Sequence, residues 1–595
     1  MNLQEVFSYP IKPDYIIRKK KSLKKELENS TQDFLQKKIA ILGGSTTSEI
    51  KNILDLFLLN NGIKASFYES AYNQYFEEAV FSKQGIEDFA PDIIYIHTTV
   101  LNISTFPEIS FKEKDINQLV ENEINKFKKI WDSLQDYQCS IIQNNFEYTL
   151  DRPLGNLDCY DIHGRTFFIN KINSGLAYHA SKIKNLYLND INYLSSLIGL
   201  ENWFDRRMWY QAKFAISVNS IPLLAHNLTK IINSILGNQK KCLTLDLDNT
   251  CWGGIIGDDG IEKINLGSDN PIGESYVEFQ KYINELKNRG ILLAINSKND
   301  IKHALQGLEH PDSVLKETHF EIIKANWDAK DKNLKLIAQD LNIALQHIVF
   351  IDDSPLERDL VTSQLSSVSV PNIQNDSSRY IDFIDKNGFF EPISLTEEDI
   401  KRASYYSSNN LRAADQSLFD NYTDFLSSLS MVGIIRPFDV THIERIHQLI
   451  NKTNQFNLTT RRYEMGELIS ILDSDKHITL FGKLNDKYGE NGIVSILIGE
   501  VKKKSCHLNL FLLSCRVFNR TMEHAMFNEF VKISKEKGLD DIYGYYYPTK
   551  KNQIVKNLFD DLGLQKIQSK INEHIWKLDI ESFSYCQNQI SIQDE

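Results

Sequence analysis

The sequence predicts a multidomain protein of the α/β class, and three observations lead to this prediction. At 595 residues the chain exceeds what one hydrophobic core normally covers, so three or four domains are expected. Its composition, 42% hydrophobic and 25% charged, is that of a globular protein. Apolar strand-like runs alternate with amphipathic helical runs in two separate regions, which is the pattern of parallel sheets covered by helices.

The clearest alternation lies in the middle of the chain. Strand-like runs are expected within Leu243–Thr250 and at Ile291–Ser297 and His347–Asp353, and each delivers polar side chains towards its end. A helix from about Ser275 to Arg289 is indicated by one apolar face and a following glycine, and another begins near Lys330. Because parallel sheets bind ligands beyond the carboxyl ends of their strands, we expect these polar side chains to converge.

The converging side chains suit phosphoryl chemistry. Asp246 and Asp248 are two residues apart on a strand, so they are predicted to point the same way; one carboxylate would attack phosphorus and the other would serve as general acid and base. Asp352 and Asp353 end the third strand and complete a predicted site for a divalent cation. Ser297 at a strand end and Lys330 at a helix N-terminus are suited to hold phosphate, as are helix N-termini in general.

These motifs, in this order, resemble those of the haloacid dehalogenase (HAD) superfamily, whose fold is a Rossmann-like parallel sheet. Asp246-Leu-Asp-Asn-Thr250 running into Trp252-Gly-Gly254, followed later by Ala325-Asn-Trp-Asp328, resembles its FkbH-like branch, subfamily IIIC. The resemblance implies that Asp246 is the nucleophile and Asp248 the acid and base. It further implies the following assignments: phosphate binding by Ser297 and Lys330, substrate binding by Asn249, Thr250 and Asn299, and Mg²⁺ binding by Asp246, Asp248, Asp352 and Asp353.

The N-terminal third predicts a second α/β domain. Lys38–Ser45 is an expected strand that ends in a glycine turn and a hydroxyl, and further strands are expected at Asp92–Ile96 and Ser140–Asn145. This pattern resembles the SGNH-hydrolase fold, with Ser45 in the nucleophile position and Asn144 or Asn145 near the oxyanion position. The region Asp205–Trp209 offers no histidine to activate the serine. A degenerate, non-hydrolytic domain is therefore favoured over a catalytic one.

The C-terminal region predicts an α+β domain. Strands are expected at Ile493–Ile498 and His507–Leu513, followed by a helix with Met522 and Phe530 on one face. The pattern is similar to GNAT acyltransferases, but in the run Arg516–Thr521 non-glycine residues stand where that family has glycines beside coenzyme A. Coenzyme A binding is thus doubtful, and receipt of the pantetheine arm of a carrier protein is the alternative.

Two further stretches leave alternatives open. Cys515, beside Arg516, is read as a buried strand-end thiol, with an acyl relay as the alternative. The amide-rich run Leu449–Tyr463, typical of the FkbH-like branch, would either hold a ligand or a domain interface, or be a buried hydrogen-bonded connector, and the two interpretations carry about equal weight. Cys251, next to the predicted nucleophile, is read as a small buried thiol.

The expected organisation has six parts. They are an N-terminal extension (1–36), the SGNH-like domain (37–232), the HAD-like domain (238–392), a helical connector (393–430), the GNAT-like domain (431–580) and a tail (581–595).

Composition limits the function classes. The net charge of −12 disfavours nucleic-acid binding, seven cysteines without paired spacing indicate neither a disulfide framework nor a zinc site, and no apolar stretch is long enough to cross a membrane. The start of the chain lacks the pattern of a secretory signal, so a cytoplasmic location is expected.

The resemblance implies an enzyme with a concrete reaction in a biosynthetic pathway such as polyketide or other secondary metabolism. A glyceryl unit would be taken from 1,3-bisphosphoglycerate, with loss of phosphate, and loaded on a separate acyl carrier protein. Two alternatives remain: a phosphatase for a small metabolite without acyl transfer, and a non-catalytic carrier-binding or assembly protein.

Overall fold

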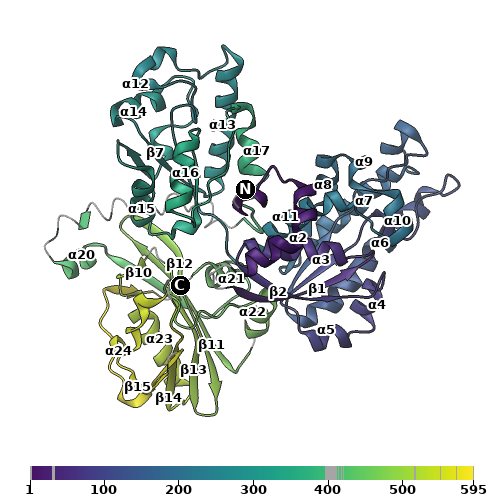
Figure 1. The fold of residues 1–595 in the computed structure, drawn as a ribbon. Coiled ribbons are helices and arrows are strands. Elements are labelled where there is room, and N and C mark those ends of the chain that lie inside the picture. The colour runs from purple at the N-terminus through teal and green to yellow at the C-terminus, as the bar shows by residue number, and fades with distance from the viewer. Residues whose placement is uncertain are drawn as a thin grey trace. The chain divides into compact units, whose positions relative to one another are not determined.

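The computed structural model describes residues 3–29, 34–395, 412, 415–416, 419, 421–453, 455–472, 474–514, 517–549, 551–570 and 572–593. The chain divides into two compact units, whose helices and strands are labelled in Figure 1. The first unit comprises Met1–Ile235 with Glu464–Glu467, and the second comprises Leu236–Tyr463 with Leu468–Glu595. Both units contain a parallel sheet, which confirms the predicted multidomain α/β class.

The first unit is built on a five-stranded parallel sheet in the order β2-β1-β3-β4-β5. The strands are β1 (Leu35–Gly43), β2 (Ile63–Glu69), β3 (Ile93–His97), β4 (Ser140–Asn144) and β5 (Leu186–Asn189). Three of these follow the prediction, whereas β2 and β5 were not predicted. The strand order reverses between β1 and β3, and such a reversal is where open parallel sheets form ligand crevices.

Helices cover both faces of this sheet. Strand residues such as Leu42 and Ile96 pack with helices α6 (Glu113–Leu134) and α7 (Arg165–Ala180) in one buried cluster. Helix α3 (Ser48–Asn60) packs against α2 (Pro13–Glu28) and α11 (Ile221–Ile235).

The remaining helices of the first unit are short. They are α1 (Leu3–Val6), α4 (Tyr75–Val80), α5 (Gln84–Phe89), α8 (Ile191–Ile198), α9 (Leu200–Trp203) and α10 (Arg206–Ala212), with 3₁₀ turns η1 (Val100–Asn102), η2 (Gln135–Tyr137), η3 (Gly155–Cys159) and η4 (Val218–Ser220).

The stretch expected as an N-terminal extension is part of the first unit. Helix α2 buries Ile16, Leu23 and Leu27, and its contacts with α3 tie it to the core. The basic run Arg18–Lys25 lies on this helix.

The second unit contains a four-stranded parallel sheet in the order β8-β7-β6-β9. The strands are β6 (Cys242–Leu245), β7 (Leu292–Ser297), β8 (Ile322–Ala325) and β9 (Ile348–Ile351). The central strand β6 pairs in parallel with both β7 and β9, so that Thr244 lies opposite Ala294 and Phe350. The carboxyl ends of these three strands therefore meet at one edge.

The helices around this sheet are α12 (Ile256–Asp259), α13 (Pro271–Asn288), α14 (Ile301–Glu309), α15 (Lys330–Asp340), α16 (Pro355–Gln364) and α17 (Tyr380–Asp385), with 3₁₀ turns η5 (Ile261–Lys263), η6 (Glu317–His319), η7 (Leu345–His347) and η8 (Ser377–Arg379). Helix α13 begins at Pro271, earlier than predicted, because the side chain of Asn270 accepts a hydrogen bond from the Gly273 N–H and caps the helix.

The C-terminal part of the second unit is an eight-stranded mixed sheet in the order β15-β16-β14-β13-β12-β11-β10-β17. The strands are β10 (Met431–Arg436), β11 (His477–Asp486), β12 (Gly489–Lys502), β13 (Ser505–Leu513), β14 (Asp541–Tyr546), β15 (Gln565–Lys570), β16 (Glu573–Asp579) and β17 (Ile590–Ile592). The helices are α20 (Tyr422–Ser428), α21 (Ile443–Lys452), α23 (Met522–Glu536) and α24 (Leu558–Asp561), with 3₁₀ turns η10 (Gln553–Val555) and η11 (Ile580–Ser582). Helix α22 (Met465–Leu472) begins among the residues assigned to the first unit and ends in the second.

The stretch expected as a tail ends in a strand of this sheet. Strand β17 pairs in parallel with β10, so that Ile590 lies opposite Met431. Most of the expected helical connector at 393–430 lies outside the described residues.

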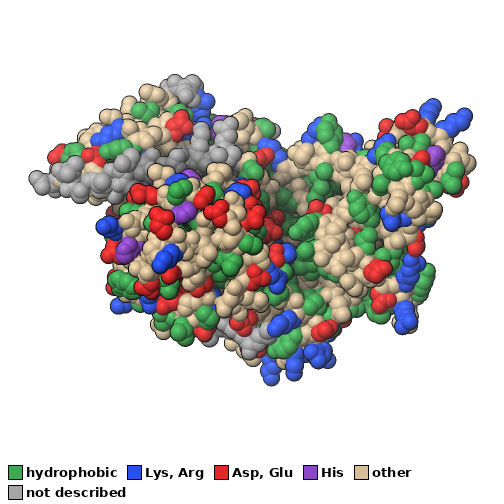
Figure 2. Space-filling view, turned by 90° about the horizontal axis from the view of Figure 1, so that it is seen from above, with side chains coloured by type: hydrophobic (Ala, Val, Ile, Leu, Met, Phe, Trp, Pro, Cys, Tyr) green, Lys and Arg blue, Asp and Glu red, His purple; other side chains and the backbone are tan. Residues whose placement is uncertain are grey.

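The distribution of surface charge and the length of the helices relate to two function classes considered above, nucleic-acid binding and membrane spanning. On the face shown in Figure 2, Lys and Arg side chains are scattered among Asp and Glu rather than gathered into one continuous area. Within the described part of the chain, helices that combine the length and the apolar character needed to cross a membrane are absent.

Candidate active site

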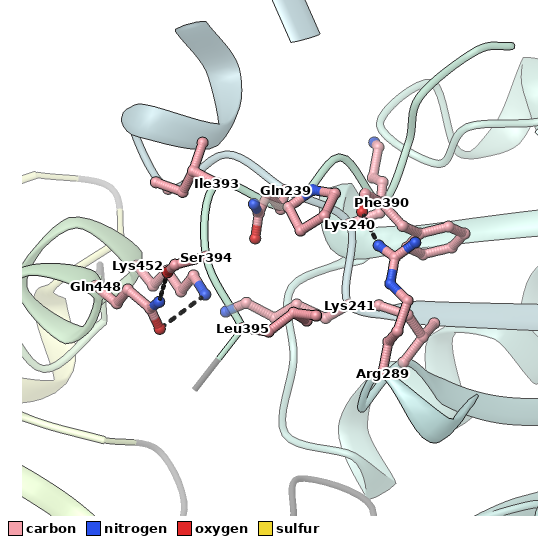
Figure 3. Close-up of a pocket in the computed structure, with 13 residues that line it drawn as sticks. Gln239, Lys240, Lys241, Arg289, Phe390, Ile393, Ser394, Leu395, Gln448 and Lys452 are labelled. Atoms are coloured by element: carbon pink, nitrogen blue, oxygen red, sulfur yellow. Dashed lines mark hydrogen bonds between the residues drawn. The ribbon is translucent and has the colours of Figure 1, made fainter. Parts of the chain in front are cut away.

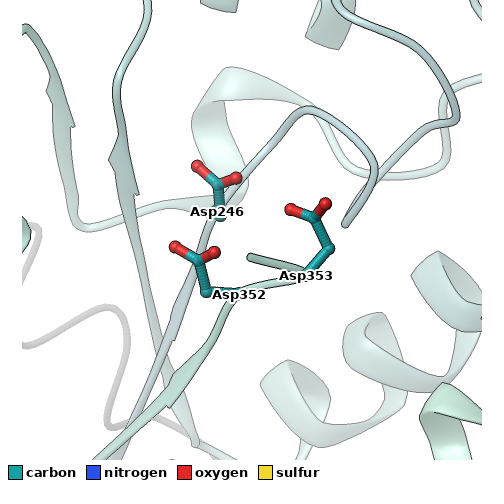
Figure 4. A group of neighbouring side chains, drawn as sticks. All are labelled: Asp246, Asp352 and Asp353. Carbon is teal, nitrogen blue, oxygen red and sulfur yellow. The ribbon is translucent and has the colours of Figure 1, made fainter. Parts of the chain in front are cut away.

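A cluster of three carboxylates lies at the carboxyl edge of the four-stranded sheet. Asp246 directly follows β6, and Asp352 and Asp353 directly follow β9. One carboxylate oxygen from each of the three lies within 4.8 Å of the others, and the three side chains face a common space (Figure 4). A set of hard oxygen ligands at this spacing suits a Mg²⁺ ion.

Burial raises the pKa of the Asp352 and Asp353 carboxyls to about 6, and the negative charge of Asp246 adds to the rise. The cluster is therefore costly unless a cation neutralises it.

Lys330 supplies such a cation from the N-terminus of α15. Its Nζ lies 2.6 Å from Asp246 Oδ1 and 3.0 Å from Asp352 Oδ2, and it donates to the Asn296 carbonyl at 2.7 Å. The Lys330 side chain is only 2% exposed. Burial alone would lower the pKa of its ammonium, but Asp246 and Asp352 raise that pKa above its usual value, so Lys330 stays charged.

Two asparagines that sequence reasoning missed hold Lys330 in place. The Asn296 side-chain amide donates to the Lys330 carbonyl at 3.0 Å, and Asn333 donates to Asn296 Oδ1 at 3.1 Å. Both asparagines are completely buried. A buried polar side chain next to the strand-end serine of β7 is the signal that would have pointed to Asn296.

Asp248 is not part of the carboxylate cluster. Its Oδ1 accepts hydrogen bonds from the Trp252 indole N–H at 2.9 Å and the Ile256 N–H at 3.1 Å, and its Oδ2 accepts from Asn299 at 3.0 Å. The chain has left β6 at Leu245, so strand alternation no longer decides where Asp248 points. Of the four side chains expected to bind the metal, Asp246, Asp352 and Asp353 lie together and Asp248 lies apart from them.

Burial raises the pKa of the Asp248 carboxyl, and the hydrogen bonds from Ile256 and Trp252 oppose this rise. A raised pKa suits a group that gives up and regains a proton.

The residues expected to contact phosphate and substrate differ in their surroundings. Ser297 ends β7 and is buried at the same edge as Asp246. Asn299 positions Asp248. Asn249 adopts a left-handed backbone conformation (φ 54°), and its side chain accepts from the Gly254 N–H. Thr250 is fully buried, and its hydroxyl accepts from the Asp353 N–H at 3.2 Å, so both side chains help to hold the loop that follows β6.

Of the two thiols singled out, only Cys251 lies within the described residues. It is completely buried, its Sγ donates to the Asp246 carbonyl, and burial raises the pKa of its thiol well above the usual range. Cys515 and Arg516 lie outside the described residues.

A separate small cavity of about 40 Å³ lies near the amino ends of β6 and β7 (Figure 3). Lys240, Lys241 and Arg289 line it, and Gln448 donates to Ser394 Oγ at 2.7 Å across its wall. Since this is the edge of the sheet opposite to the carboxylates, the cavity is not part of the candidate active site.

In the first unit, the hydroxyl of Ser45 lacks a base. Ser45 follows the Gly43-Gly44 turn after β1, is buried, and its Oγ has no hydrogen-bond partner among the described residues. Asn144 does not serve an oxyanion position beside it, because its side chain bonds to the Thr98 carbonyl and to Asn189. The amide beside the turn is Asn102, which donates to the Gly44 carbonyl at 2.9 Å and was not predicted.

The other predicted asparagine, Asn145, is also engaged elsewhere. Its side chain donates to Asp190 Oδ1 at 2.7 Å and accepts from the Asn192 N–H.

In the C-terminal domain, the turn before α23 keeps an unusual backbone. Asn519 (φ 63°) and Thr521 (φ 60°) are both left-handed, the conformation that glycine adopts most easily. The first turn of α23 carries Glu523, whose carboxylate is buried, and one of its oxygens has no partner among the described residues. The Glu523 carboxylate would therefore repel any other negatively charged group placed at the N-terminus of α23.

Part of the amide-rich run fills the gap between two parallel strands. Strands β13 and β14 pair only over Ser505–Leu508 and Asp541–Gly544. Beyond that point the plug segment, residues 456–459, lies between them. The Leu458 N–H donates to the Phe511 carbonyl of β13, and the Leu458 carbonyl accepts from the Tyr547 N–H just after β14.

Comparison with known proteins adds two likenesses. The family model described as FkbH, N-terminal domain, matches residues 38–233. The N-terminal part of the protein BF1531 from Bacteroides fragilis, a crystal structure that contains a phosphatase domain complexed with Mg, is 28% identical to this chain. The match covers 63% of this chain and 99% of that one, with a TM-score of 0.59.

Other structural matches are weak. The ribosomal-protein-S18-alanine N-acetyltransferase from Escherichia coli is 10% identical and covers 25% of this chain and 94% of its own, with a TM-score of 0.21. The PaiA N-acetyltransferase from Thermoplasma acidophilum, in complex with coenzyme A, is 11% identical. The match covers 25% of this chain and 98% of that one, with a TM-score of 0.20. These scores carry no argument about activity, and no curated protein matches the chain. The chain is thus similar to the FkbH N-terminal domain over residues 38–233, and to a Mg-bound crystal structure that contains a phosphatase domain.

Proposed function

We propose that this chain is a Mg²⁺-dependent phosphatase in which Asp246 is the nucleophile. The observation that carries the proposal is the buried cluster of Asp246, Asp352 and Asp353 around the Lys330 ammonium, at the carboxyl edge of a parallel sheet. The Mg-bound phosphatase-domain structure from Bacteroides fragilis supports the choice of metal. The same three carboxylates would hold Mg²⁺, whose charge would favour binding of a phosphate dianion there.

The residues have distinct roles in the proposed reaction. An oxygen of Asp246 attacks phosphorus, and the bond from phosphorus to the leaving oxygen breaks. Asp248, whose carboxyl pKa is raised by burial, gives a proton to that leaving oxygen. It then takes a proton from the water that hydrolyses the phospho-aspartate. Lys330 and Ser297 hold the phosphate oxygens throughout.

The finer proposal concerns the substrate. With 1,3-bisphosphoglycerate and a separate acyl carrier protein, the carrier thiol would attack the acyl carbon and release the acyl phosphate group as inorganic phosphate. Asp246 would remove the remaining phosphate ester at C3, leaving a glyceryl thioester on the carrier. The support for this step is the FkbH match. Cys515 remains a candidate relay for the acyl group.

Intact-mass analysis of the carrier tests both the phosphatase role of Asp246 and the loading of the glyceryl unit on the carrier. With wild-type protein, Mg²⁺, 1,3-bisphosphoglycerate and a pantetheinylated carrier, we expect a glyceryl adduct. Asp246→Asn should yield a phosphoglyceryl adduct instead, because acyl transfer does not need Asp246. The exposed Asp258→Asn is the matched control and should behave like wild type.

The outcomes separate the alternatives. A glyceryl adduct that disappears in Cys515→Ser would support the relay. Phosphate release without any adduct would leave a phosphatase for a small metabolite. Unchanged phosphate release by Asp246→Asn would refute the assigned nucleophile.

A further inference from the structure

The first unit contains a pocket that the phosphatase chemistry does not use. It has a volume of about 290 Å³, close to the lower end of the roughly 300–1,000 Å³ typical of small-molecule sites. Its lining comes from the turn after β3, the loop after β4, and helices α9 and α10. These loops lie at the carboxyl edge of the five-stranded sheet, where such sheets bind ligands.

Aromatic side chains make up much of the wall. They are Phe106, Tyr148, Trp203, Phe204, Trp209 and Tyr210. Aromatic faces carry partial negative charge and attract organic cations, most strongly when the site is desolvated.

The one nearly fully buried carboxylate in this wall is Glu147, which is 3% exposed. Its Oε2 accepts a hydrogen bond from the Val100 N–H at 3.2 Å, and within the described residues it forms no ion pair. Burial raises the pKa of this carboxyl to about 7, since no cationic side chain opposes the effect. A buried carboxylate that lacks a cation is a costly group to keep.

A second buried group in the wall also lacks a partner. The indole nitrogen of Trp203 is completely buried and has no properly aligned hydrogen-bond acceptor among the described residues, although it lies near enough to Glu147 to lower the pKa of that carboxyl. Buried polar groups without partners are rare, so a ligand or an ordered water is expected beside them.

The cationic side chains that line the pocket are engaged elsewhere. Arg206 forms a two-pronged ion pair with Asp151, at 2.8 and 3.0 Å, on the exposed side of the pocket. The Arg165 guanidinium lies over the Phe106 ring, 5.2 Å from its centroid. Neither makes a hydrogen bond or ion pair to Glu147 among the interactions of the described residues.

We propose that this pocket binds a small organic amine, with the ligand's ammonium group against Glu147 and its apolar or aromatic body against the walls formed by Trp203 and Trp209. The ammonium supplies the charge that Glu147 lacks, and the aromatic walls favour a cation and an apolar body together. Ser45 Oγ has no hydrogen-bond partner among the described residues, so the proposal is one of binding and not of cleavage.

The test uses three probes that share one phenyl body. Phenethylamine is a cation, 2-phenylethanol is neutral and phenylacetate is an anion. Isothermal titration of the full-length protein at pH 8 should show the amine binding at least about tenfold more tightly than the alcohol, with phenylacetate weakest. Equal affinity for amine and alcohol, tighter binding of phenylacetate, or no heat with any of the three overturns the proposal.

Two variants assign the effect to the pocket. Glu147→Gln should weaken amine binding at least about tenfold and leave the alcohol unchanged, whereas the exposed Glu108→Gln in the same unit should change neither. Trp209→Ala should weaken the binding of both probes, because it removes part of the wall. Amine binding that survives both Glu147→Gln and Trp209→Ala would place the amine elsewhere and overturn the assignment.

Discussion

Replacing Lys330 with methionine should have two opposite effects at the carboxylate cluster: lower stability of the metal-free protein and tighter binding of Mg²⁺. The ammonium lies 2.6 Å from Asp246 and 3.0 Å from Asp352, with all three side chains largely buried. Each attraction is on the order of 6 kcal/mol at an effective dielectric constant of about 20, before the desolvation cost is subtracted. Removing one partner of a buried ion pair typically costs about 3–5 kcal/mol, because the other charge is left unpaired. We expect Lys330→Met to destabilise the metal-free protein by about that amount.

The same change should strengthen metal binding. Three carboxylates and one ammonium carry a net charge of −2, and three carboxylates alone carry −3. The variant should therefore bind Mg²⁺ more tightly, by about tenfold or more at pH 8, although it has lost phosphatase activity.

Two measurements check these effects. Hydrogen exchange of peptides from β6 and β9, without and with Mg²⁺, reports the local stability, and isothermal titration reports the Mg²⁺ affinity. Lys298→Met is the control, because its ammonium pairs with Glu357 in a partly exposed position. Unchanged exchange in the metal-free variant, or weaker Mg²⁺ binding, would refute the reasoning.

Three further predictions concern other parts of the chain. The pKa of the Glu147 carboxyl is about 7, above its ordinary 4.5, so the free energy of unfolding falls as pH rises between these values. At pH 8 the Glu147→Gln variant should therefore be about 3 kcal/mol more stable than wild type, and near pH 4 the two should be equally stable. Urea unfolding at both pH values measures this difference. The Asp486 carboxylate is fully buried and bonds to both Arg412 and Arg520, so Asp486→Asn should destabilise the C-terminal domain by about 3–5 kcal/mol. The loss should appear as faster hydrogen exchange in β11, and equal exchange in variant and wild type would contradict this. Ser45→Ala should leave any hydrolysis of p-nitrophenyl acetate unchanged, and a loss of that activity would show that a base reaches the serine after all.

The parts of the candidate site that could be predicted are those set by strand ends. Asp246, Asp352 and Ser297 directly follow or end apolar strands, and parallel strands bring such residues to one edge. Asp248 could not be placed in this way, because β6 ends at Leu245 and the loop geometry takes over. Asn333, which supports Lys330 through Asn296, lies on a helix, and its pairing depends on tertiary packing that a sequence pattern does not contain.

In the fold, too, some elements have a clear sequence pattern and others do not. Strand β2 is only partly buried along most of its length, and β5 has four residues, so neither produces a strong apolar run. The start of α13 did have a sequence signal, since Asn270 and Pro271 form a capping residue followed by a first-turn proline. The predicted start near Ser275 rested only on the apolar face further along the helix and on the glycine that follows it.

The plug segment of the C-terminal domain changes what an extended ligand would meet between β13 and β14. Residues 456–459 already pair with the backbone of β13, through Leu458 to Phe511 and through the Leu513 N–H to the Phe456 carbonyl. Because the segment is tethered to the same polypeptide, it competes with any incoming chain at a high effective concentration. Any extended ligand that pairs with β13 here has to displace this internal competitor, so its observed affinity is its intrinsic affinity reduced by the cost of releasing four residues of the protein itself.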